Sequence, residues 1–265
     1  MLSILIVYSL VGAVAGVLAG LLGIGGGLVI VPMLVYCLEL QGLGGNSIMH
    51  ISLGTSMASI IFTSVSSFMA HHKRGAVEWR IVKLIALGIV VGTYLGSCVA
   101  SNLSTKTLKG FFIIFLYYVA AQMLTNKKPK ASRSIPGKLV MFGVGNAIGA
   151  VSSLVGIGGG SLSVPFMVWC NIPIHKAIGT SAAIGFPIAL AGTVGYLING
   201  LKIADLPPYS LGYIYLPALA GIVMVSVLTA PFGVKLAHSL PVDKLKRVFA
   251  LLLLLVGTKM LVSLF

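Results

Sequence analysis

The sequence predicts an all-α polytopic membrane protein built from two inverted-topology repeats. Of its 265 residues, 58% are hydrophobic and only 8% are charged, and the mean hydropathy is +1.08, whereas a soluble domain has roughly 25% charged residues. Several apolar runs reach the ~20 residues that a helix needs to cross the hydrocarbon core of a bilayer. The clearest of these runs are Ile51–Ala70, Ile81–Ala100, Leu211–Val234 and Val248–Phe265.

An internal repeat supports the two-fold organisation. Residues Gly20–Pro32 align without a gap with Ser153–Pro165 at an offset of 133 positions, and both contain the pattern GIGGGxxxVP. Downstream, His50–Ser56 aligns with His175–Ser181 at an offset of 125, in a second shared pattern, HxxxGTS. Because the order of the motifs is the same in both halves, we interpret the halves as structural repeats.

The domain boundaries follow from a third match and from the charge distribution. Leu103–Phe112 resembles Leu240–Phe249 at an offset of 137, near the end of each half. The most polar stretch of the chain lies between the halves and contains five Lys or Arg residues. We therefore expect a first repeat at residues 1–125, a basic cytoplasmic linker at 126–138 and a second repeat at 139–265.

Each repeat is expected to begin with a hairpin of two short helices, with the GIGGG motif as the break between them. About three transmembrane helices are expected to follow. Glycine adopts backbone angles that other residues avoid, and the apolar pieces that follow the motif, Leu28–Leu40 and Ser161–Cys170, are too short to span a bilayer. Lipid satisfies no backbone polar group, so non-helical backbone at this depth must be buried in protein or line a watery cavity. The alternative is that the glycines only allow close helix packing.

The basic residues favour inverted over parallel repeats. If each broken hairpin makes an even number of crossings, 14 of the 18 Lys and Arg residues fall on one side, whereas parallel repeats give a division of 11 to 7. Cytoplasmic loops carry an excess of Lys and Arg. We therefore expect a cell (inner or plasma) membrane protein with both termini outside the cytoplasm, and basic loops that contact anionic lipid headgroups. The net charge of +14 then reflects topology and not nucleic-acid binding.

The short helices after the breaks predict an anion-binding site. The free N–H groups and positive dipole end of a helix N-terminus favour negative charge, and two such ends are expected to meet around a pseudo-twofold axis. The HxxxGTS motifs add hydroxyl groups beside a glycine. The candidate substrate-binding residues are Gly25, Gly26, Gly27, Thr55, Ser56, Gly158, Gly159, Gly160, Ser161, Thr180 and Ser181, and the candidate coupling residues are His50 and His175.

Structural roles compete with these assignments. Ser and Thr hydroxyls often bond to the backbone of their own helix, and each histidine stands where a helix is expected to start at the membrane interface. The acidic residues, Glu39, Glu78, Asp205 and Asp243, all lie near segment ends. A mid-membrane carboxylate is therefore not expected, which suits a negatively charged substrate and leaves a histidine or neutral oxygens for any ion coupling.

The motif content argues against an enzyme. The chain has no HExxH motif, and its three cysteines form no CxxC pair, so we expect neither catalysis nor a cofactor, a metal or a disulfide framework. The doubled GIGGGxxxVP and HxxxGTS patterns resemble the TauE/SafE family of sulfite and organosulfur-anion transporters over nearly the whole chain. That resemblance implies a small sulfur oxyanion or sulfonate as substrate, such as sulfite, sulfoacetate or thiosulfate.

The leading interpretation is a secondary transporter that works by alternating access around a midplane site. The residues themselves argue only for a negatively charged substrate, whereas the sulfur comes from the resemblance. An anion channel is the nearest alternative, and an intramembrane enzyme is a more distant one. The sequence leaves open the particular anion, the direction of transport and the oligomeric state.

Overall fold

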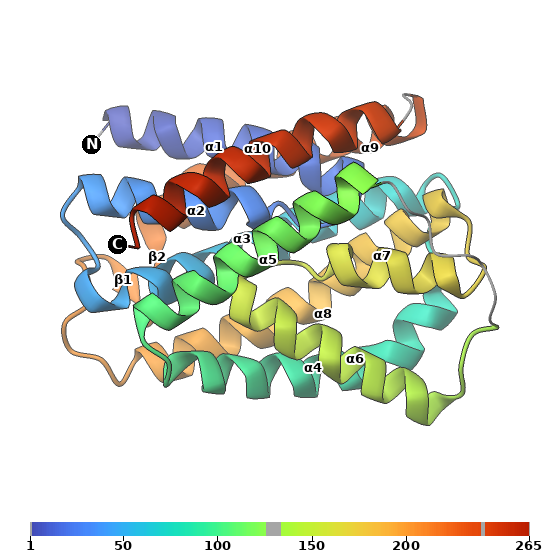
Figure 1. The fold of residues 1–265 in the computed structure, drawn as a ribbon, viewed down its shortest axis with the longest axis horizontal. Coiled ribbons are helices and arrows are strands. Elements are labelled where there is room, and N and C mark those ends of the chain that lie inside the picture. Colours follow the sequence, from blue (N-terminus) through green and yellow to red (C-terminus); the bar gives the residue numbers. More distant parts are fainter. Residues whose placement is uncertain (1, 126–133, 240–241, 265) are drawn as a thin grey trace.

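The protein is an assembly of roughly aligned helices, described by a computed structural model for residues 2–125, 134–239 and 242–264, with side chains described for 5–125, 134–239 and 247–264 (Figure 1). The described part of the chain contains α1 (Leu2–Leu22), α2 (Gly27–Leu40), η1 (Gly45–Ser47), α3 (Ile48–His72), α4 (Trp79–Ser101), α5 (Thr105–Thr125), α6 (Lys138–Val155), α7 (Gly160–Trp169), α8 (Ile174–Gly200), β1 (Ser210–Leu211), β2 (Ile214–Tyr215), α9 (Leu216–Ser239) and α10 (Val242–Val262). The expected linker lies mostly outside the described residues.

The helix lengths confirm the all-α polytopic membrane fold. Seven helices of the described chain are long and apolar enough to cross a membrane. The two helices that follow the glycine motifs are short, with 14 residues in α2 and 10 in α7. The helices before the motifs are long, with 21 residues in α1 and 18 in α6. Each broken hairpin therefore joins a full-length helix to a short one, and the expectation of two short helices was wrong.

Glycine conformation explains where the short helices begin. Gly26 precedes α2 with φ at 81°, and Gly159 precedes α7 with φ at 74°. Both angles lie in the left-handed region, which residues with a Cβ atom rarely adopt. The chain therefore reverses at the same position of each repeat.

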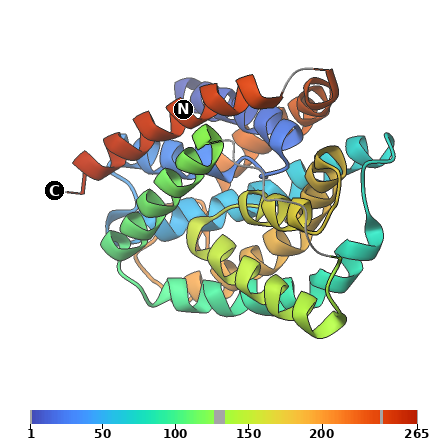
Figure 2. The same cartoon turned by 45° about the vertical axis from the view of Figure 1, so that its right-hand side comes forward.

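Helix packing follows the same pattern in both halves. Helix α1 packs along α9 and α6 packs along α4, while α3 crosses α8 and α5 contacts α10. In Figure 1, α1, α3 and α5 run from left to right, and α6, α8 and α10 run from right to left. Figure 2 shows α3 and α8 lying in the interior of the assembly. These opposite directions are compatible with the expected inverted repeats, which stay a prediction, as does the orientation in a membrane.

One predicted span starts later than expected. The apolar run Leu211–Val234 was expected to be helical, but its first residues form an antiparallel hairpin in which Leu211 pairs with Ile214. Gly212 supplies a left-handed turn, with φ at 55°, and the hairpin docks on α3. Helix α9 therefore begins only at Leu216.

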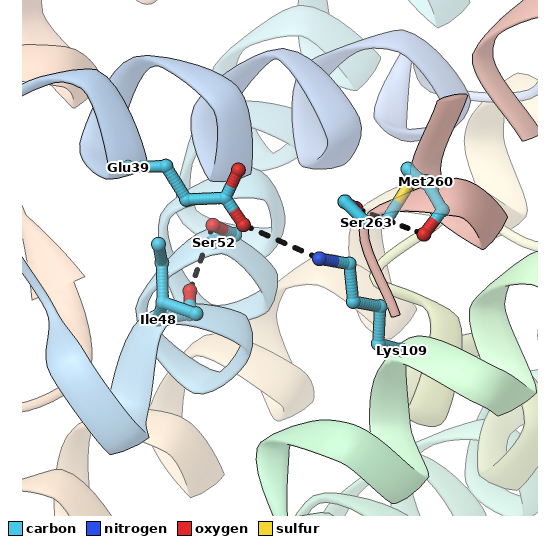
Figure 3. A network of polar contacts seen from close by, with 6 residues as sticks. All are labelled: Glu39, Ile48, Ser52, Lys109, Met260 and Ser263. Carbon is cyan, nitrogen blue, oxygen red and sulfur yellow. Dashed lines mark hydrogen bonds and ion pairs between the residues drawn. The ribbon is translucent and has the colours of Figure 1, made fainter. Parts of the chain in front are cut away.

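An ion pair holds the far end of α2 in place. Figure 3 shows the Lys109 ammonium of α5 beside the carboxylate of Glu39 in the last turn of α2; Nζ and Oε1 are 3.2 Å apart, and the lysine side chain is only 8% exposed. The second repeat has Ile172 where Glu39 stands in the first. The pair therefore fixes one short helix but has no counterpart on the other.

Candidate functional site

The two glycine breaks meet each other at the centre of the protein. The Gly158 amide donates a hydrogen bond to the Ile24 carbonyl, at 3.3 Å. A Cβ atom on Gly25 would lie 3.2 Å from the Gly158 Cα, and one on Gly27 would lie 2.1 Å from the Gly156 oxygen. The symmetry-related contact is present as well, because a Cβ on Gly160 would lie 2.3 Å from the oxygen of Gly23. The predicted meeting of the two breaks thus appears in the fold, with backbone against backbone.

The serines of the two HxxxGTS motifs form hydrogen bonds to these breaks, each from one repeat to the other. The Ser56 hydroxyl in α3 donates to the carbonyl of Gly156, at 2.8 Å. Its counterpart in α8, Ser181, donates to the carbonyl of Gly23, at 2.9 Å. Each serine therefore binds the break of the opposite repeat. This hydrogen bond gives both hydroxyls a structural partner.

The threonines of the same motifs fix the loops that precede the next helices. Thr55 Oγ1 accepts a hydrogen bond from the Tyr215 amide, and Thr180 Oγ1 accepts one from the Glu78 amide, both at 2.9 Å. Glu78 and Tyr215 are themselves equivalent at the offset of 137. All four hydroxyls of the HxxxGTS motifs are fully buried and held by the protein in this conformation.

The remaining predicted residues surround the starts of the short helices. Gly26 and Gly159 accept the first internal hydrogen bonds of α2 and α7, so the amides just after them are the free ends of these helices. Ser161, in the first turn of α7, is 5% exposed, and its hydroxyl has no hydrogen-bond partner. Among the predicted site hydroxyls, which all belong to described residues, Ser161 alone is buried without a hydrogen-bond partner.

Sequence reasoning missed two further buried hydroxyls, one beside the second break and one where α4 packs on α6. Ser152 and Thr93 are completely buried, and no partner is described for either oxygen. The Ser152 oxygen would lie 3.3 Å from a Cβ on Gly159. A buried polar atom without a partner is costly, and such atoms in native proteins often mark functional sites. Both residues lie outside the repeated motifs, and for that reason they were not singled out.

A narrow crevice lies beside the first break. Its walls come from α1, the break, α3 and α8, and it is too tight for a water-sized sphere. The lining residues are Ala19, Gly23, Gly25, Ser64, Ser67, Ala182 and Gly185. None of the lining side chains is charged. The crevice therefore brings small residues and two hydroxyls to the point where the two repeats meet.

The crevice has a filled counterpart on the other side of the breaks. Ala182 and Gly185 of α8 are equivalent to Met57 and Ile60 of α3 at the offset of 125, and both of these larger side chains are completely buried. The Ile60 Cγ2 would lie 3.0 Å from a Cβ on Gly25. The pseudo-symmetric centre therefore has space on one side and bulky side chains on the other.

The two predicted coupling histidines lie at opposite ends of the assembly, near the starts of α3 and α8. His50 is 5% exposed, and its Nε2 lies 3.2 Å and 3.1 Å from the carbonyl oxygens of Ala100 and Leu103. His175 is exposed and stacks on His238, with ring centroids 5.3 Å apart. The structure therefore brings neither histidine to the crevice.

Charged groups stay away from the centre. Among the described residues, Glu39 and Glu78 are paired with Lys109 and Lys176, and no group of three or more His, Cys, Asp or Glu side chains could hold a metal ion. The residues that line the crevice therefore present small apolar groups and two serines, and none of them carries a charge.

Comparison with known proteins agrees with this geometry. The sequence matches the family described as Sulfite exporter TauE/SafE over residues 8–260. It is 39% identical to a probable membrane transporter protein of Haemophilus influenzae, over 98% of this chain and 99% of the relative. It is 24% identical to the probable membrane transporter protein MJ0441 of Methanocaldococcus jannaschii, over 95% and 93% of the two chains.

A third relative, the probable membrane transporter protein YunE of Bacillus subtilis, is 29% identical over 74% of this chain and 79% of its own length. No solved structure matches the chain. The family match spans both glycine breaks and both HxxxGTS motifs. The chain is therefore a multi-pass membrane transporter that belongs to the sulfite exporter TauE/SafE family.

Proposed function

We propose that this protein transports a small sulfur-containing anion, a sulfur oxyanion or a sulfonate, and binds it in the crevice beside the paired glycine breaks. One observation carries the proposal. The breaks of the two repeats touch at Gly25 and Gly158, so the free ends of α2 and α7 and the crevice lie at one interface. In transporters made of inverted repeats, substrates bind at such an interface between discontinuous helices.

The chemistry of the centre supports a negatively charged substrate. The first amides of α2 and α7 have no partner inside their helices, and the dipoles of both helices are positive at these ends. Ser64 and Ser67 line the crevice; in this conformation their hydroxyls donate to the carbonyls of Ile61 and Ala19, so they are proposed to turn toward an anion only when it binds. Because no carboxylate lines it, an anion meets no like charge there.

The shape of the centre supports a carrier over an anion channel. The crevice has no room for a water-sized sphere, so a substrate can reach it only after the helices move. The filled side, around Met57 and Ile60, is closed as well. We propose that rocking of the repeats opens the two sides in turn, which is alternating access.

The crevice side is proposed to face the cytoplasm. It lies on the half of α3 that leads to Lys73 and Arg74, and this is the side expected from the sequence to carry 14 of the 18 Lys and Arg residues. Both chain ends lie at the opposite end of the assembly (Figure 1). The positive-inside rule then places the termini outside the cytoplasm.

Binding to the purified protein tests the substrate class. We expect thiosulfate, sulfite or sulfoacetate to bind more tightly than a neutral analogue of similar size, and a preference for the neutral compound contradicts the proposal. Ala182→Met should abolish binding, since it copies the side chain that fills the other side. Ala121→Met, at an exposed position of α5, is the matched control and should bind normally. A single-channel conductance would favour a channel over a carrier.

A further inference from the structure

One ring nitrogen of His71 is hydrogen-bonded, and the other has no hydrogen-bond partner among the described residues. It lies in α3, is 1% exposed, and its Nε2 is 2.9 Å from the carbonyl oxygen of Gly20 in the last turns of α1. A carbonyl oxygen only accepts hydrogen bonds, so Nε2 must carry the hydrogen. The neutral ring then has a lone pair on Nδ1, which is buried without a partner among the described residues. Nδ1 is therefore the atom of this ring that can gain a proton.

The other repeat shows that the structural role of His71 does not need this second nitrogen. Its counterpart at the offset of 125 is Tyr196, whose hydroxyl donates to the carbonyl of Ser153, at 2.8 Å. Ser153 is in turn the counterpart of Gly20. Both side chains hold the same carbonyl before the break, but only the histidine adds a second nitrogen that can accept a proton.

The position of His71 links it to the crevice. Ser67, which lines the crevice, precedes His71 by four residues on α3 and so lies one turn away on the same face. Gly20, the hydrogen-bond partner of His71, follows Ala19, another lining residue. A proton on His71 would therefore sit at the outer end of the proposed anion site.

The groups around His71 are basic. His238 of α9 has its ring centroid 5.6 Å away, His175 of α8 stacks on His238, and Arg74 follows in the next loop. Glu78, the carboxylate of that loop, is paired with Lys176 at 2.6 Å. Adding a positive charge to this buried, basic surrounding costs free energy unless a negative charge arrives with it.

We infer that His71 takes up a proton when an anion occupies the crevice, so that the protein carries anion and proton together. Binding of each ligand then promotes binding of the other, because linkage is reciprocal. This inference rests on the proposed function and assigns its coupling ion. It also replaces His50 and His175, the histidines that the sequence suggested for coupling, by one that neither motif contains.

Calorimetry of thiosulfate binding to the purified full-length protein tests the inference. Thiosulfate stays fully ionised in the neutral pH range, so any proton taken up comes from the protein. Titrations in two buffers with different ionisation enthalpies give the number of protons bound per anion. We expect uptake approaching one proton, and a Kd that rises by up to about tenfold per pH unit where uptake is complete.

Variants identify the site. In His71→Gln the amide can still donate to the Gly20 carbonyl but cannot take a proton, so thiosulfate should bind without proton uptake and with a Kd that no longer depends on pH. His71→Tyr, which copies Tyr196, should give the same result and replaces His71→Gln if that variant does not fold. His50→Gln is the matched control, since His50 has the same ring arrangement far from the crevice, and it should keep the uptake.

The outcomes separate the inference from the function on which it rests. If neither thiosulfate nor sulfoacetate binds to the wild-type protein, the proposed function itself fails. If thiosulfate binds to the wild type without proton uptake, the inference is wrong and the function stands. Uptake that persists in a folded His71 variant, or that disappears in His50→Gln, also overturns the assignment.

Discussion

Replacing Gly27 by Ala should destabilise the protein strongly, because the two breaks touch through their backbones. A Cβ on Gly27 would lie 2.1 Å from the carbonyl oxygen of Gly156. Ordinary van der Waals contact begins at 3.4 Å, so the two chains would have to separate by about 1.3 Å (3.4 minus 2.1). The atom in the way belongs to the backbone, and no flexible side chain can move to relieve the clash.

The expected magnitude follows from measurements of overpacked protein cores. Added methyl groups in well-packed sites typically cost about 1–3 kcal/mol, and each 1 kcal/mol lowers Tm by roughly 2–4 °C in a protein of this size. Gly27→Ala should therefore lower Tm by about 2–12 °C, and Gly160→Ala should behave similarly because its Cβ would meet the Gly23 oxygen at 2.3 Å.

A matched control separates this clash from the general effect of the substitution. Gly143 lies in α6 and faces outward, and a Cβ there would meet nothing within 4 Å. Gly143→Ala should leave Tm unchanged or raise it, since alanine favours the helix by about 1 kcal/mol over glycine. Thermal unfolding of the detergent-solubilised protein, followed by intrinsic fluorescence, provides the measurement. Equal Tm values for Gly27→Ala and Gly143→Ala would refute the contact between the breaks.

Four further predictions concern the glycine breaks, the serine hydrogen bonds to them, the Glu78–Lys176 ion pair and the orientation. Gly25→Val and Gly158→Val should abolish transport while expression stays measurable, and full activity in either variant would count against a site at the breaks. Ser56→Ala and Ser181→Ala should each lower the free energy of unfolding by about 1–3 kcal/mol, because a buried carbonyl loses its donor; unchanged denaturation curves would show that these bonds are dispensable. Glu78→Gln should change stability by at most about 1 kcal/mol, since both side chains of its ion pair are partly exposed, and a larger loss that salt does not reduce would contradict this. In a cysteine-free background, Lys73→Cys should react with impermeant reagents only from the cytoplasm and Lys202→Cys only from outside, and the reverse pattern would invert the proposed topology.

The sequence predicted those parts of the fold that depend on local patterns. The helical membrane class followed from the long apolar runs, and the short helices after the glycine motifs were expected at Leu28–Leu40 and Ser161–Cys170 and were found at Gly27–Leu40 and Gly160–Trp169. The glycines of the break and the length of the apolar segment after it can both be seen in a short stretch of sequence, so they could be predicted. The start of α9 was missed because the hairpin before it is stabilised by contacts with α3, such as that of Thr55 with the Tyr215 amide.

The candidate site was only partly predictable, because its contacts join residues that are far apart in the chain. The meeting of the breaks was anticipated from the repeat, but the partners of the hydroxyls were not. Ser56 binds a carbonyl 100 positions away, and Ser181 binds one 158 positions away. His71 and Ser152 carry no motif of their own, and they became visible only when the structure showed buried polar atoms without partners.

Under the proposed alternating access, the departures from symmetry at the centre would determine which side opens more readily. In two identical inverted repeats, the inward-open and outward-open conformations would be related by the pseudo-twofold axis and would have equal free energy. Here Met57 and Ile60 fill one side, whereas Ala182 and Gly185 leave the other side with the crevice. Opening the filled side must separate large buried side chains, and the resulting loss of apolar contact adds about 1.5–3 kcal/mol for each side chain that becomes fully exposed. On the proposed mechanism, Met57 and Ile60 would therefore bias the protein toward opening on the crevice side, where His71 and its basic neighbours lie.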